Sequence, residues 1–490
     1  MLSSADNARV SSAGEPSGDA GRSARTALWL WAIVIAGLVL RLIALGYKSF
    51  WIDEIASVAI ARRASQTFWH FLWHDEGNMA GYYVLLRPWL YFGYGEGTVR
   101  VLSVIPGVIS IPVMYVLGRK LFGQRTAIIA TLLLSLNACS IFISQEARAY
   151  SFVLLAVLLS TFLFVRLIES PAYGVACAYA IVAGLSCYFH YFCVLVPVAH
   201  YAAVIGLRAN RRPWKALMLS ATIIVVMTAP ILWLMHVQDT GHISWVQPTS
   251  WLELYHLGAY LAAASGKALG AVLLALNLVL VGFFLRGFRT AWSGVDGRWR
   301  WLLVASLVAT PIVITLLASL IRPAFYHRFL VICLPGWVLM TALGVEQIRI
   351  QGWRVAAITG VCGLSLASTV ILYHRVTEDW RDAVDHLISN GQPADRVLYY
   401  QSVGEFAGEN YRDWLPGGSA PRPKPIAVDP AARDWERQIA DAPRVWLVVY
   451  RAKPNDAEVD QIQEKLNERA LSLKMVSSYP GVTLMEFVRK

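Results

Sequence analysis

Residues 49–54, Ser49-Phe50-Trp51-Ile52-Asp53-Glu54, directly follow the first long apolar run of the chain, Thr26 to Leu45. Two adjacent carboxylates therefore stand where a membrane-spanning segment reaches the lipid–water interface. An acidic side chain at that depth costs several kcal/mol unless it is paired or hydrated, so such residues are functional candidates by default. The alternative is that Asp53 caps a following helix. Capping leaves the grouping of Trp51, Asp53 and Glu54 at one interface unexplained, and we therefore expect the stretch to be functional.

The composition excludes a soluble enzyme. The 490 residues are 57% hydrophobic and 15% charged, with a mean hydropathy of +0.50. Apolar runs of about 17–25 residues recur along the chain, as is typical of polytopic helical membrane proteins. All six cysteines fall in apolar segments without metal-ligand spacing, which favours a packing role. The net charge of +11 reports orientation in a membrane before it reports any anionic partner.

The apolar runs predict about eleven spans. We expect them at 27–46, 99–118, 126–144, 151–167, 173–188, 191–207, 216–235, 268–285, 301–320, 330–345 and 355–373. Between spans seven and eight, His236 to Lys267 is expected to form a long polar loop.

The stretch 47–98 is predicted to lie on the outer side of the membrane. Within it, Ile55 to Ala64 and Ser65 to His74 suit short amphipathic helices in the interface. Residues 81–92 are apolar but short and contain Arg87 and Pro88, so we expect a third interfacial helix there. With this choice the dense basic clusters that follow all fall in the cytoplasm, as the positive-inside rule demands.

After Tyr373 the chain becomes charged and mixed. Its patterns predict strands at 396–400, 445–450 and 482–488 and helices at 377–388, 406–414 and 456–469, with a proline- and glycine-rich loop at 416–425. The predicted fold is therefore an all-α polytopic membrane domain with interfacial helices in its first outer loop, followed by a small C-terminal α/β soluble domain. The expected divisions are 1–25, a disordered cytoplasmic N-terminus; 26–373, the transmembrane domain; and 374–490, the extracytoplasmic domain.

On this topology four polar groups meet at the outer ends of spans. They are Asp53-Glu54, Gln145-Glu146-Ala147-Arg148, Tyr188-Phe189-His190-Tyr191 and Tyr326-His327-Arg328. A carboxylate can deprotonate a hydroxyl nucleophile, and an arginine can hold a phosphate and stabilise it as it leaves. Transfer of a sugar from a lipid phosphate at a membrane surface needs both.

Each of these residues also has a simpler explanation. His190 is equally consistent with an ordinary packed histidine, and Arg148 and Arg328 also suit lipid headgroups. Glu146 and Arg148 are two residues apart and would not share one face of a helix, so one of them points away from any site unless the helix ends there.

Five stretches in the first third of the chain carry a family resemblance when taken together. They are Trp51-Ile52-Asp53-Glu54, Tyr82-Tyr83-Val84-Leu85-Leu86-Arg87-Pro88-Trp89-Leu90, Val99-Arg100-Val101-Leu102-Ser103, Leu117-Gly118-Arg119-Lys120-Leu121-Phe122-Gly123 and Ser144-Gln145-Glu146-Ala147-Arg148-Ala149-Tyr150. Their combination resembles the membrane glycosyltransferases related to protein O-mannosyltransferases and aminoarabinose transferases, which have the C-type glycosyltransferase fold. The resemblance is strong over residues 28–200 and weak beyond them.

This resemblance implies an integral membrane glycosyltransferase. It would transfer a sugar, such as mannose or another hexose or a pentose, from a polyprenyl-phosphate donor to a glycan, lipid or protein acceptor, with inversion. The expected location is the bacterial inner membrane, with the active site and the C-terminal domain on the extracytoplasmic side. We expect no nucleic-acid partner and require no cofactor; a divalent metal is compatible with the scheme without being needed.

The resemblance and the grouping of polar residues at span ends together suggest roles. The acidic motif of the family corresponds to Asp53 and Glu54, with Asp53 as general base and Glu54 orienting the acceptor or an arginine. Arg148 and Arg328 would bind the donor phosphate, and Glu146, His190, His327 and Tyr82 would be further substrate contacts. Many relatives carry His-Pro-Pro where this chain has Asn78-Met79-Ala80-Gly81, which puts the substrate class in doubt because that segment borders the family's active site.

Two other functions compete with this prediction. A polyprenyl-lipid transporter or flippase would need polar groups lining the spans at mid-membrane, whereas the charges here cluster at span ends. A non-catalytic subunit that only binds the lipid carrier would keep its activity after Asp53→Asn.

Overall fold

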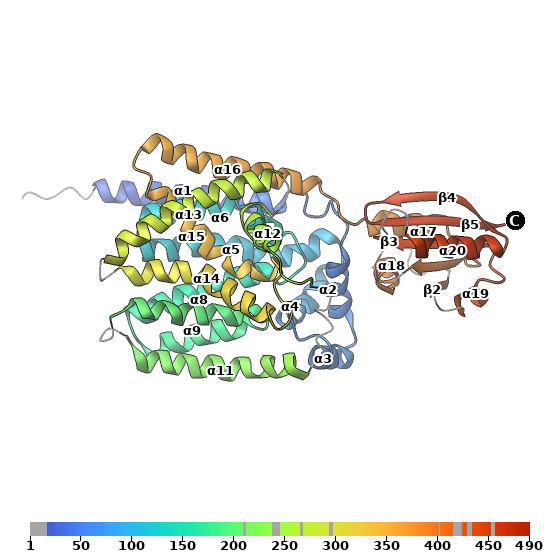
Figure 1. The fold of residues 1–490 in the computed structure, drawn as a ribbon, viewed down its shortest axis with the longest axis horizontal. Helices are drawn as coiled ribbons and strands as arrows, with labels where there is room; N and C mark the ends of the chain where they lie inside the picture. Colours follow the sequence, from blue (N-terminus) through green and yellow to red (C-terminus); the bar gives the residue numbers. More distant parts are fainter. Residues whose placement is uncertain are drawn as a thin grey trace, which may run out of the picture.

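A computed structural model of the chain describes residues 17–208, 212–237, 246–264, 268–293, 297–400, 402–414, 424–428, 434–451 and 456–490. A long helical bundle forms most of it, and a sheet region follows at one end (Figure 1). The predicted fold class is confirmed. Residues 1–16 and most of the predicted loop at 416–425 lie outside the described residues.

Helical segments occupy all eleven of the predicted span positions. They are α1 (Ser17–Leu42), α5 (Glu96–Phe122), α6 (Gln124–Leu136) with α7 (Ala138–Ser144), α8 (Tyr150–Glu169), α9 (Tyr173–Ser186), α10 (Leu195–Ala203) with its flanking 3₁₀ turns, α11 (Trp214–Val237), α13 (Ala268–Ser293), α14 (Arg298–Ser319), α15 (Leu334–Glu346) with the preceding 3₁₀ turn Phe329–Cys333, and α16 (Gln351–His374). Among the described residues, eight helices are long and apolar enough to cross a membrane, and the pair α6–α7, bent by 54°, would be a ninth. The segments Tyr173–Ser186 and Tyr191–Gly206 are shorter.

Helix α1 corrects one expectation. It begins at Ser17, inside the stretch 1–25 that was predicted to be disordered. Once the apolar part of α1 has formed a helix, adding residues at its end requires no new nucleation, so a polar extension of modest propensity can follow it.

The stretch 47–98, which we call the first outer loop after its predicted position, folds into short helices as expected. It contains α2 (Ile52–Arg62), α3 (Ser65–His74), α4 (Ala80–Trp89) and the 3₁₀ turn Leu90–Phe92. These helices have 11 residues or fewer, too short to span a bilayer. They lie together at the end of the bundle nearest the sheet region (Figure 1).

The expected polar loop at 236–267 is wrong for its second half. Helix α12 (Trp251–Ala263) forms there and buries Leu257, Tyr260 and Leu261. The sequence Leu-Gly-Ala-Tyr-Leu-Ala-Ala from 257 to 263 is apolar enough to pack, which the neighbouring polar residues conceal.

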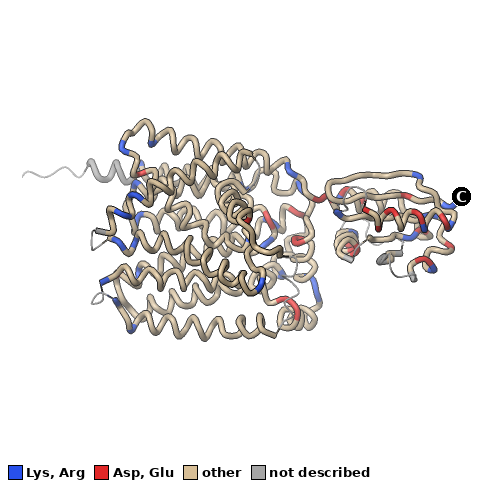
Figure 2. The backbone as a smooth tube through the Cα atoms, viewed as in Figure 1, with Lys and Arg blue, Asp and Glu red and all other residues tan. Residues whose placement is uncertain are grey.

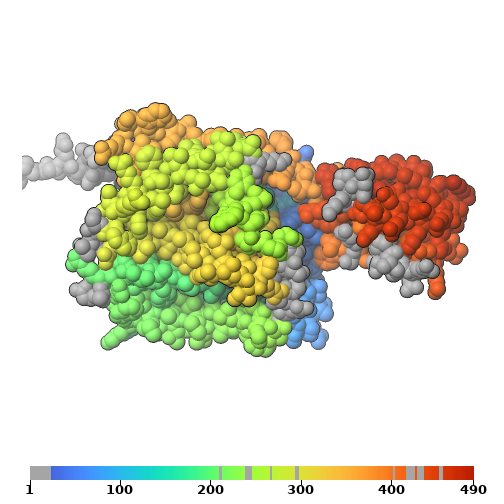
Figure 3. Space-filling view, in the orientation of Figure 1, coloured from blue at the N-terminus to red at the C-terminus, as the bar shows by residue number. Residues whose placement is uncertain are grey.

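The C-terminal region is a five-stranded sheet of order β2-β1-β3-β5-β4. Its strands are β1 (Arg396–Tyr400), β2 (Lys424–Val428), β3 (Arg444–Tyr450), β4 (Leu471–Tyr479) and β5 (Val482–Arg489), and its helices are α17 (Trp380–Asn390), α18 (Ser402–Trp414), α19 (Asp434–Gln438) and α20 (Ala457–Glu468). β1 pairs in parallel with β2 and β3, whereas β5 is antiparallel to β3 and β4. Figure 3 shows this region seated beside the first outer loop, which is coloured blue.

The two unpredicted strands lie at the edges of the sheet. β2 contains Pro425, which removes a backbone donor and is tolerated at an edge. β4 is largely exposed, and therefore lacks the apolar pattern by which the other strands were found.

A buried arginine connects α1 to the bend between α6 and α7. The Arg41 side chain is inaccessible to solvent. Its Nη1 donates to the carbonyl oxygens of Gly37 and Ser135 at 2.9 and 3.1 Å, Nη2 donates to Ser140 Oγ at 2.7 Å, and Nε to Ser144 Oγ at 3.2 Å. These acceptors satisfy a charge that would otherwise be very costly in a membrane.

Two glycines allow the helices to approach this arginine. A Cβ at Gly107 of α5 would lie 2.1 Å from Ser144 Oγ, and one at Gly37 of α1 would lie 2.4 Å from Ile111 Cδ1. Small residues at such crossings are typical of helix packing in membranes.

We predict that Arg41→Ala destabilises the bundle, because the variant loses four hydrogen bonds from one charged group. The expected loss is on the order of 3 kcal/mol, measured as thermal unfolding in detergent by tryptophan fluorescence. Arg166→Ala, at an exposed position of α8, is the control. Equal melting temperatures for the two variants would contradict this role for Arg41.

Candidate functional site

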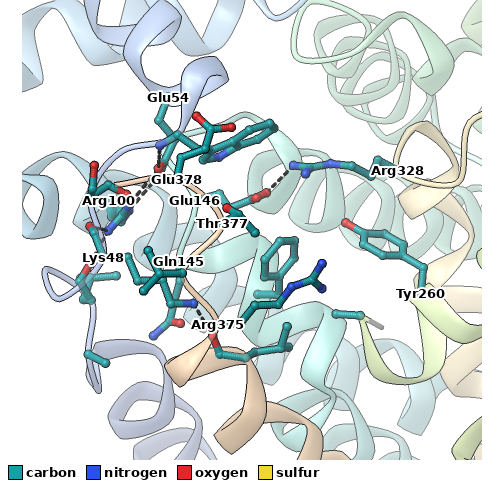
Figure 4. Close-up of a pocket in the computed structure, with 18 of the residues that line it drawn as sticks. Lys48, Glu54, Arg100, Gln145, Glu146, Tyr260, Arg328, Arg375, Thr377 and Glu378 are labelled. Atoms are coloured by element: carbon teal, nitrogen blue, oxygen red, sulfur yellow. Dashed lines mark hydrogen bonds and ion pairs between the residues drawn. The ribbon is translucent and has the colours of Figure 1, made fainter. Parts of the chain in front are cut away.

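A cavity of about 360 Å³ lies at the outer-loop end of the bundle. Its walls come from the first outer loop, the segment before α8, α12, the loop before α15, and the link from α16 to the sheet region (Figure 4). Segments from all parts of the chain therefore converge on one polar space.

Glu54 is fixed in this wall by a buried ion pair. Arg100 of α5 donates through Nε to Glu54 Oε1 at 2.8 Å and through Nη2 to Glu54 Oε2 at 2.7 Å. Glu54 also accepts from the backbone N–H of Ala147 at 2.7 Å and of Trp51 at 3.3 Å. Since both partners are almost inaccessible to solvent, Glu54 is a structural anchor as much as a site residue.

Arg100 has a second function. Its Nη1 donates to the carbonyl oxygens of Leu45 and Lys48, both at 2.8 Å, and its Nη2 to that of Ser49 at 3.0 Å. One guanidinium thus fixes the chain between α1 and α2. The sequence offered Arg100 only as part of a resembling stretch, without a role.

Asp53 is held loosely by comparison. Helix α2 begins at Ile52, so Asp53 lies in its first turn and is not the cap residue that the alternative explanation proposed. Its side chain is 42% exposed, and its closest cation is Arg148, with Nη2 3.8 Å from Oδ2. Arg148 instead donates to the Asp53 carbonyl and to Ser57 Oγ, both at 3.3 Å. The Asp53 carboxylate is therefore accessible, although Asp53 itself does not line the cavity, whose wall includes its neighbours Trp51 and Glu54.

Glu146 and Arg148 face different partners. They lie in the non-helical stretch between α7 and α8, so the objection about a shared helix face does not apply. Arg328 Nη2 lies 2.6 Å from Glu146 Oε2, and the two side chains point toward one another in Figure 4. Burial raises the pKa of the Glu146 carboxyl, and the Arg328 charge opposes that shift.

His190 lies behind the cavity wall. Its Nδ1 accepts from the Phe192 N–H at 3.2 Å, and its ring packs against Tyr150 and Phe329 with centroids 5.8 and 5.2 Å apart. Burial and the Arg148 charge lower the pKa of His190 to about 3, so the ring is neutral at physiological pH. The structure therefore supports the explanation of His190 as a packed histidine, because Nδ1 accepts a local hydrogen bond. Nε2 has no hydrogen-bond partner among the described residues.

His327 and Tyr82 differ in their access to the cavity. His327 lines it, with Nδ1 3.8 Å from Glu253 Oε2, and burial lowers its pKa to about 4. Tyr82 is completely buried in α4, its hydroxyl 3.5 Å from Ser103 Oγ, and it does not line the cavity.

The segment that replaces His-Pro-Pro packs against the 188–191 turn. Asn78 Oδ1 accepts from the Tyr191 N–H at 3.3 Å, and the Gly81 N–H donates to the Tyr188 carbonyl at 2.8 Å. Met79 has a left-handed backbone with φ 62°. In this chain the segment therefore fixes one loop to another and contributes no residue to the cavity wall.

The structure adds basic residues that the sequence did not single out. The cavity is lined by five lysine and arginine side chains, Lys48, Arg100, Arg328, Arg375 and Arg451, and by the three carboxylates of Glu54, Glu146 and Glu378. Each carboxylate pairs with one arginine. Lys48 and Arg375 form no ion pair with any described residue, so cations outnumber carboxylates in the described wall; the Lys48 ammonium donates to the Leu372 carbonyl. Lys48 precedes the acidic hexapeptide and Arg375 follows the last span, and position at a span end is the only signal that could have identified them.

No three His, Cys, Asp or Glu side chains in the described part of the chain converge as a metal site requires. The carboxylates of the cavity wall form ion pairs, and the described wall contains more cations than carboxylates.

Comparisons with known proteins agree with this architecture. The profile of the family described as dolichyl-phosphate-mannose-protein mannosyltransferase matches residues 82–233. A search of curated protein sequences gives no match.

Solved structures match over nearly the whole chain. ArnT from Cupriavidus metallidurans in the apo state superposes with a TM-score of 0.62 at 13% identity, over 94% of this chain and 97% of that one. The same protein bound to undecaprenyl phosphate gives 0.61 at 14% identity, over 94% and 98%. The oligosaccharyltransferase of Archaeoglobus fulgidus in complex with Zn and sulfate gives 0.54 at 13% identity, over 90% and 69%.

The resemblance stated from the sequence is therefore confirmed. The chain has the C-type fold of these membrane glycosyltransferases, and its residues 82–233 are similar to the dolichyl-phosphate-mannose-protein mannosyltransferases.

Proposed function

We propose that the protein is a membrane glycosyltransferase that moves a sugar from a polyprenyl-phosphate donor to an acceptor hydroxyl, with inversion. The observation that carries this proposal is the pairing of an accessible carboxylate, Asp53, with a neighbouring cavity in whose described wall cations outnumber carboxylates. The match to ArnT bound to undecaprenyl phosphate supports a donor of that class.

In the proposed reaction Asp53 takes the proton of the acceptor hydroxyl. The freed oxygen attacks the anomeric carbon of the donor sugar, and the bond from that carbon to the phosphate oxygen breaks. The polyprenyl phosphate leaves with the bonding electrons and gains negative charge. Positive groups fixed beside that phosphate stabilise the transition state more than the ground state.

We propose a different set of cations for the donor phosphate than the sequence alone predicts. Arg148 and Arg328 were expected to clamp the phosphate, but Arg148 does not line the cavity. Arg328 does, with Glu146 as its partner. We therefore assign the phosphate to Arg328 together with Lys48 and Arg375, whose charges are not neutralised by a described carboxylate.

The proposed sidedness rests on charge. Many Lys and Arg residues gather at the end of the bundle farthest from the sheet region (Figure 2), including Arg119 and Lys120 at the end of α5 and Arg298 and Arg300 at the start of α14. By the positive-inside rule that end is cytoplasmic. The cavity and the sheet region would then face the opposite side, in bacteria the periplasm.

Asp53→Asn should abolish turnover and spare donor binding, since it keeps the size of the side chain and removes the base. General-base assistance is worth about 10²–10⁴-fold. Glu54→Gln should retain measurable turnover, although weakening its pair with Arg100 should lower stability. Both variants are assayed in vitro with a lipid-linked sugar donor. Activity in Asp53→Asn with none in folded Glu54→Gln would reverse the roles, and activity in both would remove the catalytic assignment.

Lys48 should make donor binding dependent on pH. Burial, with the nearby Arg100 charge, lowers the pKa of the Lys48 ammonium to about 8. The charge is present below that pH and is lost above it, so the donor KM should rise roughly tenfold from about pH 7 to pH 9. Lys48→Arg should flatten the rise because its charge persists, and Lys48→Gln should have a high KM throughout. If donor KM in Lys48→Gln depended on pH as it does in the wild type, Lys48 would be excluded from the phosphate site.

A topology reporter tests the sidedness. A fusion after Lys490 should be active with a reporter that works only outside the cytoplasm and inactive with one that works only inside. The reverse pattern would place the cavity in the cytoplasm and contradict the proposed orientation.

A further inference from the structure

The sheet region directly contacts the turn that precedes α2. Ser49 Oγ accepts from the Trp380 N–H at 3.1 Å, and the Tyr411 hydroxyl oxygen accepts from the Phe50 N–H at 3.0 Å. Tyr411 in turn donates to Glu96 Oε1 at 2.5 Å, at the start of α5. Residues that follow α16 in the chain are thus part of the structure around the acidic motif.

Glu378 contacts the residue that precedes Asp53 in the chain. Its Oε2 accepts from the Ile52 N–H at 2.9 Å and from Trp380 Nε1 at 3.0 Å. Its Oε1 accepts from the Tyr450 hydroxyl at 3.0 Å and from Arg451 Nη2 at 2.6 Å. The side chain is completely buried in this network and also borders the cavity, near Glu54 in Figure 4.

The bond to Ile52 falls at the position where a helix needs it. Ile52 is the first residue of α2, and the first N–H groups of a helix have no acceptor within it. A carboxylate there satisfies one of them and complements the positive end of the helix dipole. Glu378 therefore determines where α2 begins and how its first turn is oriented.

The same turn is also held by the bundle. Arg100 fixes the Lys48 and Ser49 carbonyls and the Glu54 side chain, which leaves Asp53 between two independent supports. A shift of about 1 Å in a reacting group can cost around 10²-fold in rate, so loss of either support should be visible in turnover.

We propose that Glu378 is a positioning residue for Asp53, and that the C-terminal region is required for the chemical step itself as well as for any selection of acceptor. This inference rests on the proposed function, in which Asp53 is the base. It predicts a fall in kcat when the bond to the Ile52 N–H is lost, with little change in donor KM as long as the Glu378 carboxylate stays paired with Arg451 of the cavity wall.

Replacing Ile52 by proline removes the donor of the hydrogen bond that Glu378 accepts. Ile52→Pro deletes the N–H that Glu378 accepts, at the first helical position, where proline is well tolerated. The preceding residue, Trp51, has φ −92° and ψ 169°, which suits a residue before proline. Ile52→Val keeps the N–H and reduces the side chain to a similar size, and is the matched control.

The experiment uses the full-length chain and compares Ile52→Pro, Glu378→Gln and the double variant. Each single variant should lose about 10- to 100-fold in kcat. Donor KM should stay within about twofold in Ile52→Pro, which leaves the pair between Glu378 and Arg451 intact. The double variant should be no worse than the poorer single one, because Glu378→Gln weakens the acceptor and Ile52→Pro removes the donor of the same hydrogen bond to α2. Ile52→Val should remain near wild type.

Two further measurements separate positioning from general destabilisation. Glu486→Gln also alters a buried carboxylate of the sheet, one bonded to Arg444 and Lys474, and should lower the melting temperature without a selective loss of kcat. Hydrogen exchange of the backbone amides of residues 53–58 should accelerate in Glu378→Gln and Ile52→Pro and stay normal in Glu486→Gln.

The inference is overturned if Glu378→Gln retains the kcat of Glu486→Gln, or if the losses in the double variant multiply. A wild-type protein that transfers no sugar from any polyprenyl-phosphate donor overturns the proposed function instead. In that case unchanged exchange at residues 53–58 would separately refute the positioning of α2 by Glu378, and accelerated exchange would support it.

Discussion

The buried ion pair between Glu54 and Arg100 is the interaction on which the outer end of the molecule depends. It joins the first turn of α2 to α5, and through its remaining hydrogen bonds it reaches the end of α1 and the stretch before α8. Burying two charges is costly, and removing one partner of such a pair typically destabilises a protein by about 3–5 kcal/mol. The pair therefore enforces one arrangement of four chain segments, and the accessible Asp53 side chain takes its position from that arrangement.

Charge pairing also explains the chemical character of the cavity. Glu54, Glu146 and Glu378 each neutralise one arginine, so these carboxylates are already engaged before any ligand arrives. Lys48 and Arg375 form no ion pair within the described part of the chain, and the Lys48 ammonium donates to the Leu372 carbonyl. Adjacent acidic residues of the same motif thus have different environments, one buried and paired and the other half-exposed.

Much of the bundle could be predicted because spans and interfacial helices leave simple signals of length and apolar content. The position of several polar residues near one another could also be predicted, because residues at the same ends of neighbouring spans lie at one depth. Glu54, Glu146 and Arg328 do line one cavity. Partners could not be predicted: Glu54 finds Arg100 46 residues away and Glu146 finds Arg328 182 residues away. Glu378 was missed because it lies in the link to a region that carried no motif of its own, and α12 because polar neighbours concealed its apolar segment.

The contact between Ile52 and Glu378 has a consequence for the order of biosynthesis. It joins residues 326 positions apart, and a ribosome makes the chain from its N-terminus, with domains generally folding as units. Most of the bundle is therefore synthesised before the residues that complete the surroundings of Asp53 exist. The turn that carries Asp53 is among the first segments made and among the last to reach its final geometry, so a nascent or truncated chain would lack one of its two supports even after its helices have entered the membrane.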